Sequence, residues 1–585
     1  MLKAQVICRL PGTTSAWHRF SRPEAVITAM DTASVAPALA KIETAVKQGK
    51  YAAGFISYEA APAFDPAFQT YPADGFPLLW FGIFPSPGEE LSGFPTSGTA
   101  TPTPTPRITR ECYTATLDRI RQHIAAGDIY QANFTIRTGL RLDGQSPEDL
   151  FFDWCARHPV PYAAYVDTGE LQLISVSPEL FLSKDGNRLC SIPMKGTAPR
   201  QLTAEADRQA ARQLAADTKN RAENLMIVDM VRNDFGRVCV PGSITVDPLF
   251  QVSTYRTVHQ MTSTVHGLVP ADASFADILA ATFPAASITG APKIRAMEII
   301  NQTETSPRQA YTGSIGCLAP DGDFLFNVAI RTVICRDGDG ELSVGGGIVA
   351  DSEPESEWQE ALSKSKFCTA PPLPGFRLIE TMLHTRDNGF PMLAEHLDRA
   401  EASQRYFGRP FDRQQLESYL SALKIPHEYA RVRLTLDEQG QPDITVFPLP
   451  MPGWGKECLT VAIAPEQTDS REVFLYHKTT LRERYNRLFL RAQENGWDEM
   501  IFTNERGELT EGCISNLFLK INGTWLTPAL SCGLLPGLWR QKTIAELHAR
   551  EAILTLDDLA AAQNIMLGNA VRGGTQAKIK QFSRL

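Results

Sequence analysis

Lys195 has the setting of a reactive amine. It stands in the stretch IPMKGT, between apolar residues and a glycine. Burial or a neighbouring cation would lower its pKa and leave the amine neutral, and a neutral amine is a nucleophile. Glu179, in the preceding stretch SPEL, ends a predicted strand with a carboxyl group that could serve as a general acid. The alternative for Lys195 is a solvated lysine on a turn, which describes most lysines.

Two pairs of side chains have the helical spacing that could hold a hard divalent cation. Asn220 and Glu223 are three residues apart in one predicted helix, and Glu357 and Glu360 have the same spacing in another, so each pair shares a helix face. Mg²⁺ suits such a site because it accepts one or two carboxylates and keeps places for water and an anionic substrate. Each pair taken alone is more often merely solvated.

The glycine run Gly345-Gly346-Gly347 follows a predicted strand. Its backbone N–H groups can approach a ligand without interference from a Cβ atom. Beside a bound cation this run would suit a substrate carboxylate, although three glycines alone more often form a tight turn.

The last third of the chain holds a second candidate lysine. Lys478 lies in LYHKTT, Glu511 in LTEGC, Arg399 in a predicted helix, and Gly537 begins the stretch GLWR. A lysine that carries pyridoxal phosphate needs a carboxylate at the pyridine nitrogen. It also needs an arginine and the backbone amides of a helix start at the phosphate. Each of these residues alone is better explained as an ordinary surface or turn residue.

The helices expected to position these residues are marked by composition and end signals. We predict one long helix over Ala204–Arg232, which is rich in alanine and free of glycine and proline. Another helix is predicted to begin with Ser352 as its N-cap, Pro354 in the first turn and Glu355 at the capping-box position. In the last segment, a helix is predicted over Leu393–Phe407.

Strands alternate with these helices. The segments rich in β-branched or alternating apolar residues are Leu171–Ser177, Ile244–Asp247, Phe324–Cys335, Glu341–Val344 and Arg377–His384. Their order along the chain is not a simple βαβ repeat. The predicted fold class is therefore α+β.

Two composition breaks divide the 585 residues. Ser97–Arg107 alternates threonine with proline and must run extended. Thr369–Gly375 contains three prolines in seven residues, which is typical of a stiff spacer. The predicted organisation is an N-terminal lobe at 1–96, a catalytic domain at 107–368, a proline-rich linker at 369–376 and a second domain at 377–585.

Composition excludes several classes of protein. The net charge of −9 provides no positive field for nucleic acid, and no apolar run approaches the ~20 residues that span a bilayer. Arg9 and Pro11 interrupt the N-terminal apolar stretch, unlike a signal peptide. The 11 cysteines include no CxxC pair, so neither a disulfide framework nor a zinc site is indicated. We expect a cytoplasmic protein that binds neither nucleic acid nor membrane.

The middle of the chain contains, in order, the motifs SVSPELF, IPMKGTAPR, DTKNRAENLMIVDMVRNDFGRV, TVHQM, SITGAPKIRAMEII, AYTGSIG, AIRT and GGGIVADSEPESEWQE. These motifs resemble those of the chorismate-utilising enzymes, the group of anthranilate, aminodeoxychorismate and isochorismate synthases. They cover residues 107–368 densely, and residues 1–96 resemble the family more thinly. The resemblance implies a layered α+β fold that binds chorismate with Mg²⁺.

The resemblance also implies roles for particular residues. Glu223 and Glu360 match Mg²⁺ ligands, with Glu357 nearby through water. Arg331 matches a chorismate contact and suits a carboxylate, because its guanidinium donates two parallel hydrogen bonds. The other residues that match chorismate contacts are His259, Tyr311, Gly345, Gly346 and Gly347.

Lys195 distinguishes the subfamilies. Anthranilate synthases have alanine in the corresponding PIAGT motif, whereas aminodeoxychorismate synthases have lysine, as here. The implied mechanism has Lys195 attack ring C2 of chorismate while Glu179 protonates the departing C4 hydroxyl. Ammonia then adds at C4 and the lysine leaves, which gives 4-amino-4-deoxychorismate. None of the cysteines has the GxCxG setting of a class I glutamine amidotransferase, so a separate glutaminase subunit is the expected partner.

Residues 377–585 resemble the two-lobed fold-type IV pyridoxal phosphate enzymes, which include branched-chain and D-amino acid aminotransferases and 4-amino-4-deoxychorismate lyase. The resemblance implies Lys478 as the Schiff base and proton shuttle, and Glu511 at the ring nitrogen. Arg399 and the amides of Leu538 and Trp539 would hold the phosphate, supported by Ser515 and Asn516. The chain departs from relatives by lacking a GDGxF-like start, and by Trp539 where transaminases often have a hydroxyl residue.

The two resemblances together favour a bifunctional enzyme of folate synthesis. It would aminate chorismate and then eliminate pyruvate to give 4-aminobenzoate. The alternative is a chorismate-aminating domain fused to a true class IV amino-acid aminotransferase. A binding or regulatory protein with a degenerate catalytic half is disfavoured, because its catalytic side chains would be lost first and all of them are present.

Overall fold

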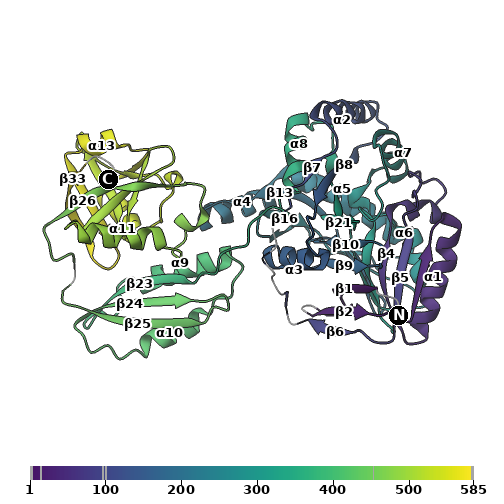
Figure 1. Cartoon of the computed structure of the whole chain (residues 1–585), viewed down its shortest axis with the longest axis horizontal. Helices are drawn as coiled ribbons and strands as arrows, with labels where there is room; N and C mark the ends of the chain where they lie inside the picture. The colour runs from purple at the N-terminus through teal and green to yellow at the C-terminus, as the bar shows by residue number, and fades with distance from the viewer. Residues whose placement is uncertain are drawn as a thin grey trace. The chain divides into compact units, whose positions relative to one another are not determined.

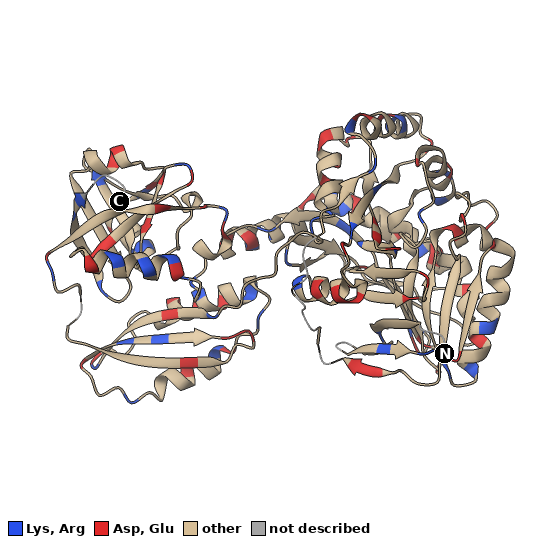
Figure 2. Cartoon of the chain, in the orientation of Figure 1, with Lys and Arg blue, Asp and Glu red and all other residues tan. Residues whose placement is uncertain are grey.

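The computed structural model of the chain describes residues 4–13, 16–91, 93–94, 98, 102–451 and 453–581. The chain divides into two compact units, and the described residues of the first fall within 1–199 and 211–373, those of the second within 200–210 and 374–585 (Figure 1). Part of the predicted extended segment Ser97–Arg107 lies outside the described residues. Basic and acidic residues are interspersed over both units (Figure 2).

The described part of the first unit contains a ten-stranded antiparallel sheet. Its strands are β1 (Gln5–Arg9), β2 (Trp17–Ser21), β6 (Glu89–Leu91), β7 (Thr105–Pro106), β8 (Gln131–Arg141), β9 (Ala164–Asp167), β10 (Gln172–Ser175), β18 (Gly290–Ala291), β21 (Thr332–Arg336) and β22 (Asp339–Ile348). They pair in the order β18-β8-β22-β21-β10-β9-β1-β2-β6, with β7 on β8.

A nine-stranded antiparallel sheet of described residues forms the second layer. Its strands, in spatial order, are β14 (Thr245–Val246), β17 (Val265–Leu268), β12 (Arg188–Ile192), β11 (Leu180–Asp185), β20 (Phe324–Asn327), β19 (Ser314–Leu318), β4 (Tyr51–Ile56), β5 (Leu79–Phe84) and β3 (Ala25–Ala29). A smaller sheet has the order β13 (Met194–Pro199), β16 (Val258–Thr262) and β15 (Gln251–Thr254).

Side chains along each strand point alternately to the two faces of its sheet, and the first unit therefore has four layers: helices, sheet, sheet and helices. Val6 and Cys8 of β1 belong to the core between the two large sheets, whereas Ile7 faces a helix layer, as the period of two requires. The helices packed on the ten-stranded sheet are α2 (Arg110–Ala125), α3 (Pro147–Arg157), α7 (Lys293–Thr303) and α8 (Pro354–Ser363). Those on the nine-stranded sheet are α1 (Thr32–Lys47), α5 (Thr218–Gly236) and α6 (Phe275–Thr282).

The second unit has two lobes. One is an antiparallel sheet of β23 (Leu378–Thr385), β24 (Tyr429–Leu436) and β25 (Pro442–Leu449), covered on one face by α9 (Leu393–Tyr406) and α10 (Arg413–Ser421). The other is an eight-stranded mixed sheet. Its strands, in spatial order, are β28 (Leu509–Gly512), β27 (Glu499–Asn504), β26 (Cys458–Thr468), β33 (Gly573–Gln581), β32 (Asn564–Asn569), β29 (Asn516–Ile521), β30 (Thr524–Pro528) and β31 (Arg550–Ala552). The helices of this lobe are α11 (Glu483–Glu494), α12 (Leu538–Leu547) and α13 (Leu556–Ala561).

The predicted α+β class is confirmed, but two predicted elements are wrong in extent. The single helix expected over Ala204–Arg232 is two helices, α4 (Ala204–Ala216) and α5. Asp217 separates them, because its side chain accepts a hydrogen bond from the Asn220 N–H as the N-cap of α5. The strand expected over Phe324–Cys335 is β20 and β21, which lie in different sheets.

The predicted start of α8 is also wrong by one residue. Glu353 is the N-cap and makes no side-chain capping bond. Ser352 instead accepts a hydrogen bond from the Val349 N–H and donates one to Glu357 Oε1 at 2.7 Å. The serine therefore fixes a candidate metal ligand rather than the end of the helix.

None of the helices in the described ranges has the combined length and apolarity required to cross a membrane.

Candidate active sites

The structure brings Lys195 together with carboxylates from three elements. Its amine, on β13, experiences the charges of Glu223 on α5, Glu360 on α8 and Glu179 just before β11. Burial lowers the pKa of Lys195, while the carboxylates oppose that shift. An amine in this setting titrates more easily to its nucleophilic form than a solvated lysine does.

A glycine at position 196 lets the Lys195 segment approach α5. Gly196 has φ +93°, and a Cβ there would lie 3.0 Å from Asn220 Oδ1. Asn224, one helical turn further along α5, donates from Nδ2 to the Lys195 carbonyl at 3.4 Å. The helix that carries Glu223 therefore also positions the backbone of the lysine.

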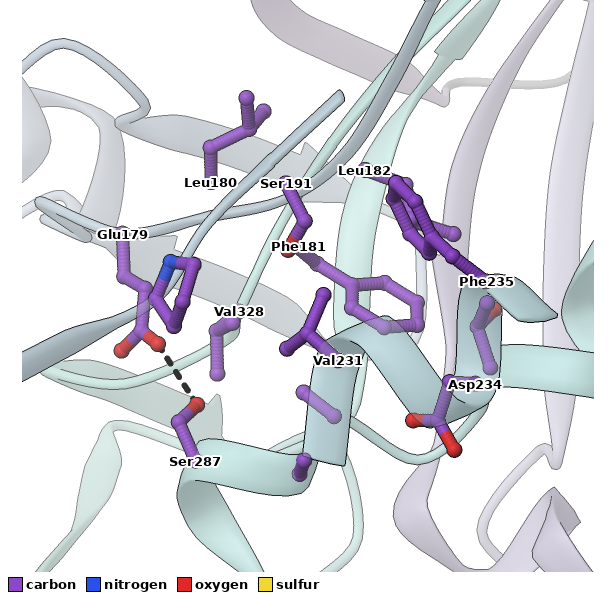
Figure 3. Close-up of a pocket in the computed structure, with 14 residues that line it drawn as sticks. Glu179, Leu180, Phe181, Leu182, Ser191, Val231, Asp234, Phe235, Ser287 and Val328 are labelled. Atoms are coloured by element: carbon purple, nitrogen blue, oxygen red, sulfur yellow. Dashed lines mark hydrogen bonds between the residues drawn. The ribbon is translucent and has the colours of Figure 1, made fainter. Parts of the chain in front are cut away.

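Glu179 is a buried carboxyl group with the titration range of an acid catalyst. Burial raises its pKa to about 7, although the Ser287 hydroxyl stabilises the charged form. Ser287 Oγ donates to Glu179 Oε1 at 2.6 Å (Figure 3). The cavity beside Glu179 has a volume of about 10 Å³, which is room for about one water molecule. A carboxyl group with this pKa is partly protonated at neutral pH and can donate a proton.

The three carboxylates predicted to bind metal face the same region. A Cβ at Gly346 would lie 3.3 Å from Glu357 Oε2 and 3.7 Å from Glu360 Oε1, and Glu223 and Glu360 both act on Lys195. Lys364 Nζ forms an ion pair with Glu360 at 2.8 Å and lowers its pKa. Burial and the neighbouring Glu360 raise the pKa of Glu357.

This donor set fits a magnesium ion in its chemistry. All three groups are oxygen donors, and the repulsion felt by Glu357 is the repulsion that a divalent cation would relieve. In the described ranges, no three side chains of the types that bind metals already converge in metal-binding geometry. In this structure the side chain of Lys364 provides the counter-charge to Glu360.

Two of the predicted chorismate contacts, Arg331 and His259, lie near residues of the Lys195 site, whereas Tyr311 lies near a different ion pair. Arg331, at φ +50°, lies near Tyr255, which in turn lies near Glu179. His259 lies on β16, which pairs with β13, and Thr254 Oγ1 is 3.0 Å from its Nδ1. Tyr311 lies buried near the Arg308–Glu304 ion pair. Among the described residues, no interaction joins Tyr311 to Lys195.

The glycine run is part of β22 rather than a loop. Gly345, Gly346 and Gly347 pair with Thr135, Phe134 and Asn133 of β8. Gly345 has its carbonyl bonded to Lys364 Nζ at 2.7 Å. A Cβ at Gly347 would collide with Lys195 Nζ, so the small residue makes room for the lysine.

Gln131 is a residue of the Lys195 site that lies outside every motif of the sequence analysis. It lies on β8, where a Cβ at Gly347 would be 2.6 Å from its Nε2, next to Lys195 Nζ. Both amide atoms are buried without a hydrogen-bond partner among the described residues. Such atoms are costly unless a ligand or water satisfies them, so Gln131 marks ligand space beside the lysine.

The second unit contains a cavity of about 470 Å³ between its lobes, lined by Lys478, Glu511, Ser515, Asn516, Leu538 and Trp539 with other residues. Burial, aided by Arg482 and Arg399, lowers the pKa of Lys478 to about 7. Burial raises the pKa of Glu511 to about 7.

Three groups hold the Glu511 carboxylate in place. Asn516 Nδ2 and the Leu535 N–H each donate to Oε2 at 3.2 Å, and the Tyr485 hydroxyl donates to Oε1 at 3.3 Å. Ser515 also lines the cavity, and its hydroxyl donates to Glu499 Oε2 at 2.8 Å. Its predicted support of the cofactor stays a prediction.

The start of α12 supplies backbone donors to the same cavity. Gly537 is its N-cap, and Leu538 and Trp539 form its first turn, where N–H groups have no acceptor within the helix. A Cβ at Gly537 would collide with Asn516 Oδ1. The Trp539 ring packs against Gly568 and Gly574, where a Cβ would lie 2.5 Å from the indole.

Arg399 is held at the cavity by a buried carboxylate that sequence analysis did not select. Arg399 Nε and Nη2 donate to the two oxygens of Glu380 at 2.9 and 2.6 Å. His396 Nδ1 lies 2.6 Å from Glu380 Oε2. Burial would raise the pKa of Glu380, but Arg399 and His396 outweigh it and lower the pKa to about 2.

The arrangement of this cavity fits pyridoxal phosphate. Lys478 offers the amine for the aldehyde, Glu511 a buried carboxylate for the ring nitrogen, and Arg399 with the α12 amides an anion site for the phosphate.

Replacement of Glu380 by glutamine should destabilise the second unit. It leaves Arg399 buried without its counter-charge, which costs about 3–5 kcal/mol in comparable pairs. The pKa of Glu380 is about 2 in the folded protein and about 4.3 in the unfolded chain. The contribution of its ion pair to the free energy of unfolding is therefore fully present above about pH 4.3 and is lost as the pH falls through about 2. Urea denaturation of Glu380→Gln against the wild type measures the loss at neutral pH. Glu395→Gln, an exposed change on α9, the helix that carries Arg399, is the control, and equal effects of the two changes would contradict the prediction.

Comparison with known proteins assigns a family to each unit. Residues 89–370 match the family described as chorismate binding enzyme, and residues 377–579 match amino-transferase class IV. Aminodeoxychorismate synthase component 1 of Salmonella typhimurium is 42% identical over 258 residues, which are 44% of this chain and 56% of that protein. The chloroplastic aminodeoxychorismate synthase of Arabidopsis thaliana is 41% identical over 264 residues, 45% of this chain and 29% of that protein.

A solved structure shares the fold of the first unit. The anthranilate synthase component I of Streptococcus pneumoniae aligns with a TM-score of 0.52 and 24% identity, over 63% of this chain and 92% of that chain. The chain spans only 29% of the Arabidopsis thaliana protein and 56% of the Salmonella typhimurium protein. Residues 89–370 belong to the chorismate-binding enzymes and residues 377–579 to the class IV aminotransferases, so this chain joins a member of each family in one polypeptide.

Proposed function

We propose that the chain makes 4-aminobenzoate from chorismate and ammonia in two steps, one in each unit. The observation that carries the proposal is the partly buried Lys195 amine among Glu179, Glu223 and Glu360, in a chorismate-binding domain. The second unit supplies a lysine and carboxylate in a cavity that fits pyridoxal phosphate. The relatives named aminodeoxychorismate synthase support the first reaction.

The first reaction is the replacement of the C4 hydroxyl of chorismate by an amine. Lys195 Nζ forms a bond to ring C2 as the C4–oxygen bond breaks, and Glu179 delivers the proton that releases the hydroxyl as water. Ammonia then bonds to C4 and the C2–Nζ bond breaks, which frees the lysine. The pKa of Glu179 of about 7 provides protonated acid at neutral pH. Arg331, which has no ion pair in the described part of the chain, is suited to a substrate carboxylate.

We assign Glu223 and Glu360 as the direct Mg²⁺ ligands, with Glu357 acting through water. When bound, the ion neutralises carboxylate charge on the substrate. The protein's part is to hold the three glutamates against β22 and to fix Glu357 through Ser352.

The second reaction releases pyruvate from 4-amino-4-deoxychorismate. Bound pyridoxal phosphate supplies an electron sink at the substrate amine. Lys478, with a pKa of about 7, removes the C4 proton and returns a proton to the departing enolpyruvyl group. Glu511 orients the ring nitrogen, and Arg399 with the Leu538 and Trp539 amides holds the phosphate. Formation of the aromatic ring drives the elimination.

The ammonia is supplied by a separate class I glutamine amidotransferase subunit. The relative named component 1 supports a partner component, and free ammonium salt should replace that subunit in a purified reaction.

One incubation tests the whole proposal. The purified chain with chorismate, Mg²⁺, pyridoxal phosphate and ammonium salt should release pyruvate and 4-aminobenzoate in equal amounts, followed by chromatography. A parallel incubation with amino acid and keto acid pairs tests the aminotransferase alternative. Amino-group exchange without 4-aminobenzoate would replace the proposed lyase with that alternative.

Removal of the Ser287 hydroxyl should shift the pH dependence of amination. The hydroxyl stabilises charged Glu179, and Lys195 and Tyr255 are the other titratable groups near that carboxyl. The amination rate should fall as pH rises through the Glu179 pKa of about 7, because the acid loses its proton. In Ser287→Ala this alkaline limb should move up by about one pH unit. An unchanged limb in the kcat/KM profile would show that Glu179 is not the titrating acid.

A further inference from the structure

The cavity of the second unit carries far more positive charge than pyridoxal phosphate requires. Its lining includes five arginines and Lys478, against Glu511 as its acidic residue. Arg399 is paired with Glu380, and Arg482 donates from Nη2 to the Cys513 carbonyl at 2.5 Å. The three remaining arginines are Arg431, Arg433 and Arg572.

Two of these arginines are presented by the face of the small sheet that lies opposite its helices. Val432 and Leu434 of β24 belong to the core beneath α9 and α10, so Arg431 and Arg433 point to the other face. Their strand neighbours Thr381 and Phe447 line the same cavity. The alternation along β24 thus places both guanidinium groups toward the cavity.

The third arginine is fixed by a tight turn after β32. Asn569 Oδ1 accepts from the Val571 and Arg572 N–H groups at 3.0 and 2.9 Å, and Asn569 Nδ2 donates to the Ile514 carbonyl. The Arg572 guanidinium lies 5.2 Å from the Trp454 ring centroid, and that of Arg431 lies 4.5 Å from Phe447. Stacking on an aromatic face leaves the N–H edges of a guanidinium free for an anion.

The three guanidinium groups are near one another without a counter-charge. Burial and the charges of Arg572 and Arg433 lower the pKa of Arg431. Among the residues that the structure describes, none of the three makes an ion pair or a side-chain hydrogen bond. An anion that enters the cavity would relieve their mutual repulsion.

We propose that Arg431, Arg433 and Arg572 form a dicarboxylate-recognition site that selects, for the Lys478 centre, an amine substrate with two carboxylates. This inference rests on the proposed function, since 4-amino-4-deoxychorismate carries a ring carboxylate and an enolpyruvyl carboxylate. Side chains two residues apart on a strand are separated by roughly 7 Å at Cα, so Arg431 and Arg433 can each hold a different carboxylate, with Arg572 supporting from the opposite lobe. An apolar amino acid, with one carboxylate, leaves part of this site unsatisfied.

A binding experiment tests the site independently of turnover. The full chain loaded with pyridoxal phosphate is titrated with isophthalate and with benzoate, and the absorbance of the bound cofactor reports binding in this cavity. Isophthalate should bind at least roughly tenfold more tightly than benzoate. The variant Arg431→Gln/Arg433→Gln/Arg572→Gln should lose that preference while it keeps the bound cofactor and the thermal midpoint. Arg413→Gln removes an arginine that is paired with Asp398 outside the cavity and should behave as the wild type.

Kinetics of the lyase reaction separate recognition from chemistry. Each single glutamine variant should raise KM for 4-amino-4-deoxychorismate roughly ten- to a hundredfold with kcat nearly unchanged. Absence of an isophthalate preference in the wild type, or its persistence in the triple variant, overturns the proposed site even if pyruvate is released. A preference that the triple variant loses, in a protein that does not release pyruvate, upholds the arginine site and overturns the proposed lyase function.

Discussion

Lys478→Ala is expected to stop the release of pyruvate and 4-aminobenzoate and to cause 4-amino-4-deoxychorismate to accumulate. The change removes the amine that is proposed both to bind the cofactor and to move the C4 proton. Loss of a positioned proton-transfer group alone lowers rates by roughly a hundred- to ten-thousandfold, so a loss of at least a thousandfold is expected. Chromatography of the reaction products measures it, and the absorbance of covalently bound pyridoxal phosphate should disappear as well.

A control lysine in the same unit distinguishes loss of catalysis from loss of folding. Lys456→Ala removes a lysine of the same unit that is paired with Asp498, and it should preserve both products. The Lys478 variant should still consume chorismate at the wild-type rate, because Lys195 lies in the other unit. Pyruvate release by Lys478→Ala near the wild-type rate would eliminate the assigned role.

Lys195→Ala should have the complementary effect. It removes the proposed nucleophile, so amination of chorismate should fall by at least roughly a thousandfold. The variant should still convert supplied 4-amino-4-deoxychorismate to 4-aminobenzoate. Chorismate consumption and product formation from each substrate, measured separately, give the two rates.

A matched lysine on the same unit provides the control. Lys184, on β11, pairs with Asp323, and Lys184→Ala should retain amination. If Lys195→Ala formed 4-amino-4-deoxychorismate as fast as the Lys184 variant, the covalent mechanism would be wrong. Loss of both activities in Lys195→Ala would instead indicate a folding defect.

The local chemistry of both sites was accessible from sequence because it depends on short motifs. The stretch IPMKGT placed a lysine beside a glycine, and the structure explains that glycine by its left-handed φ and its contact with Asn220. The helix Leu393–Tyr406 matched its prediction closely, because it has the length and end signals of an isolated amphipathic element. The α5 boundary was missed, since one aspartate used as an N-cap outweighed the helix propensity of the residues on either side.

Partners distant in the chain could not be found in this way. Gln131, Ser287 and Lys364 reach the Lys195 site from different strands and helices. Gln131 and Lys364 lie outside the recognised motifs, and Ser287 begins the motif SITGAPKIRAMEII, which does not reveal its hydrogen bond to Glu179. Glu380 and the arginines of β24 read as ordinary strand residues until the sheet face toward the cavity is known. The motif around Ser515 suggests a supporting cofactor contact, and only the structure reveals the hydrogen bond from its hydroxyl to Glu499.

The sequence by itself determined the class of fold and selected the two lysines as candidates for covalent chemistry, because those inferences depend on residue type and on spacing within a single element. Only the tertiary structure decided which carboxylates lie beside each lysine, how far burial shifts their pKa, and which arginines remain without a counter-charge. Those properties arise from distance and desolvation between segments more than a hundred residues apart, such as Glu179 and Ser287, which no local pattern encodes.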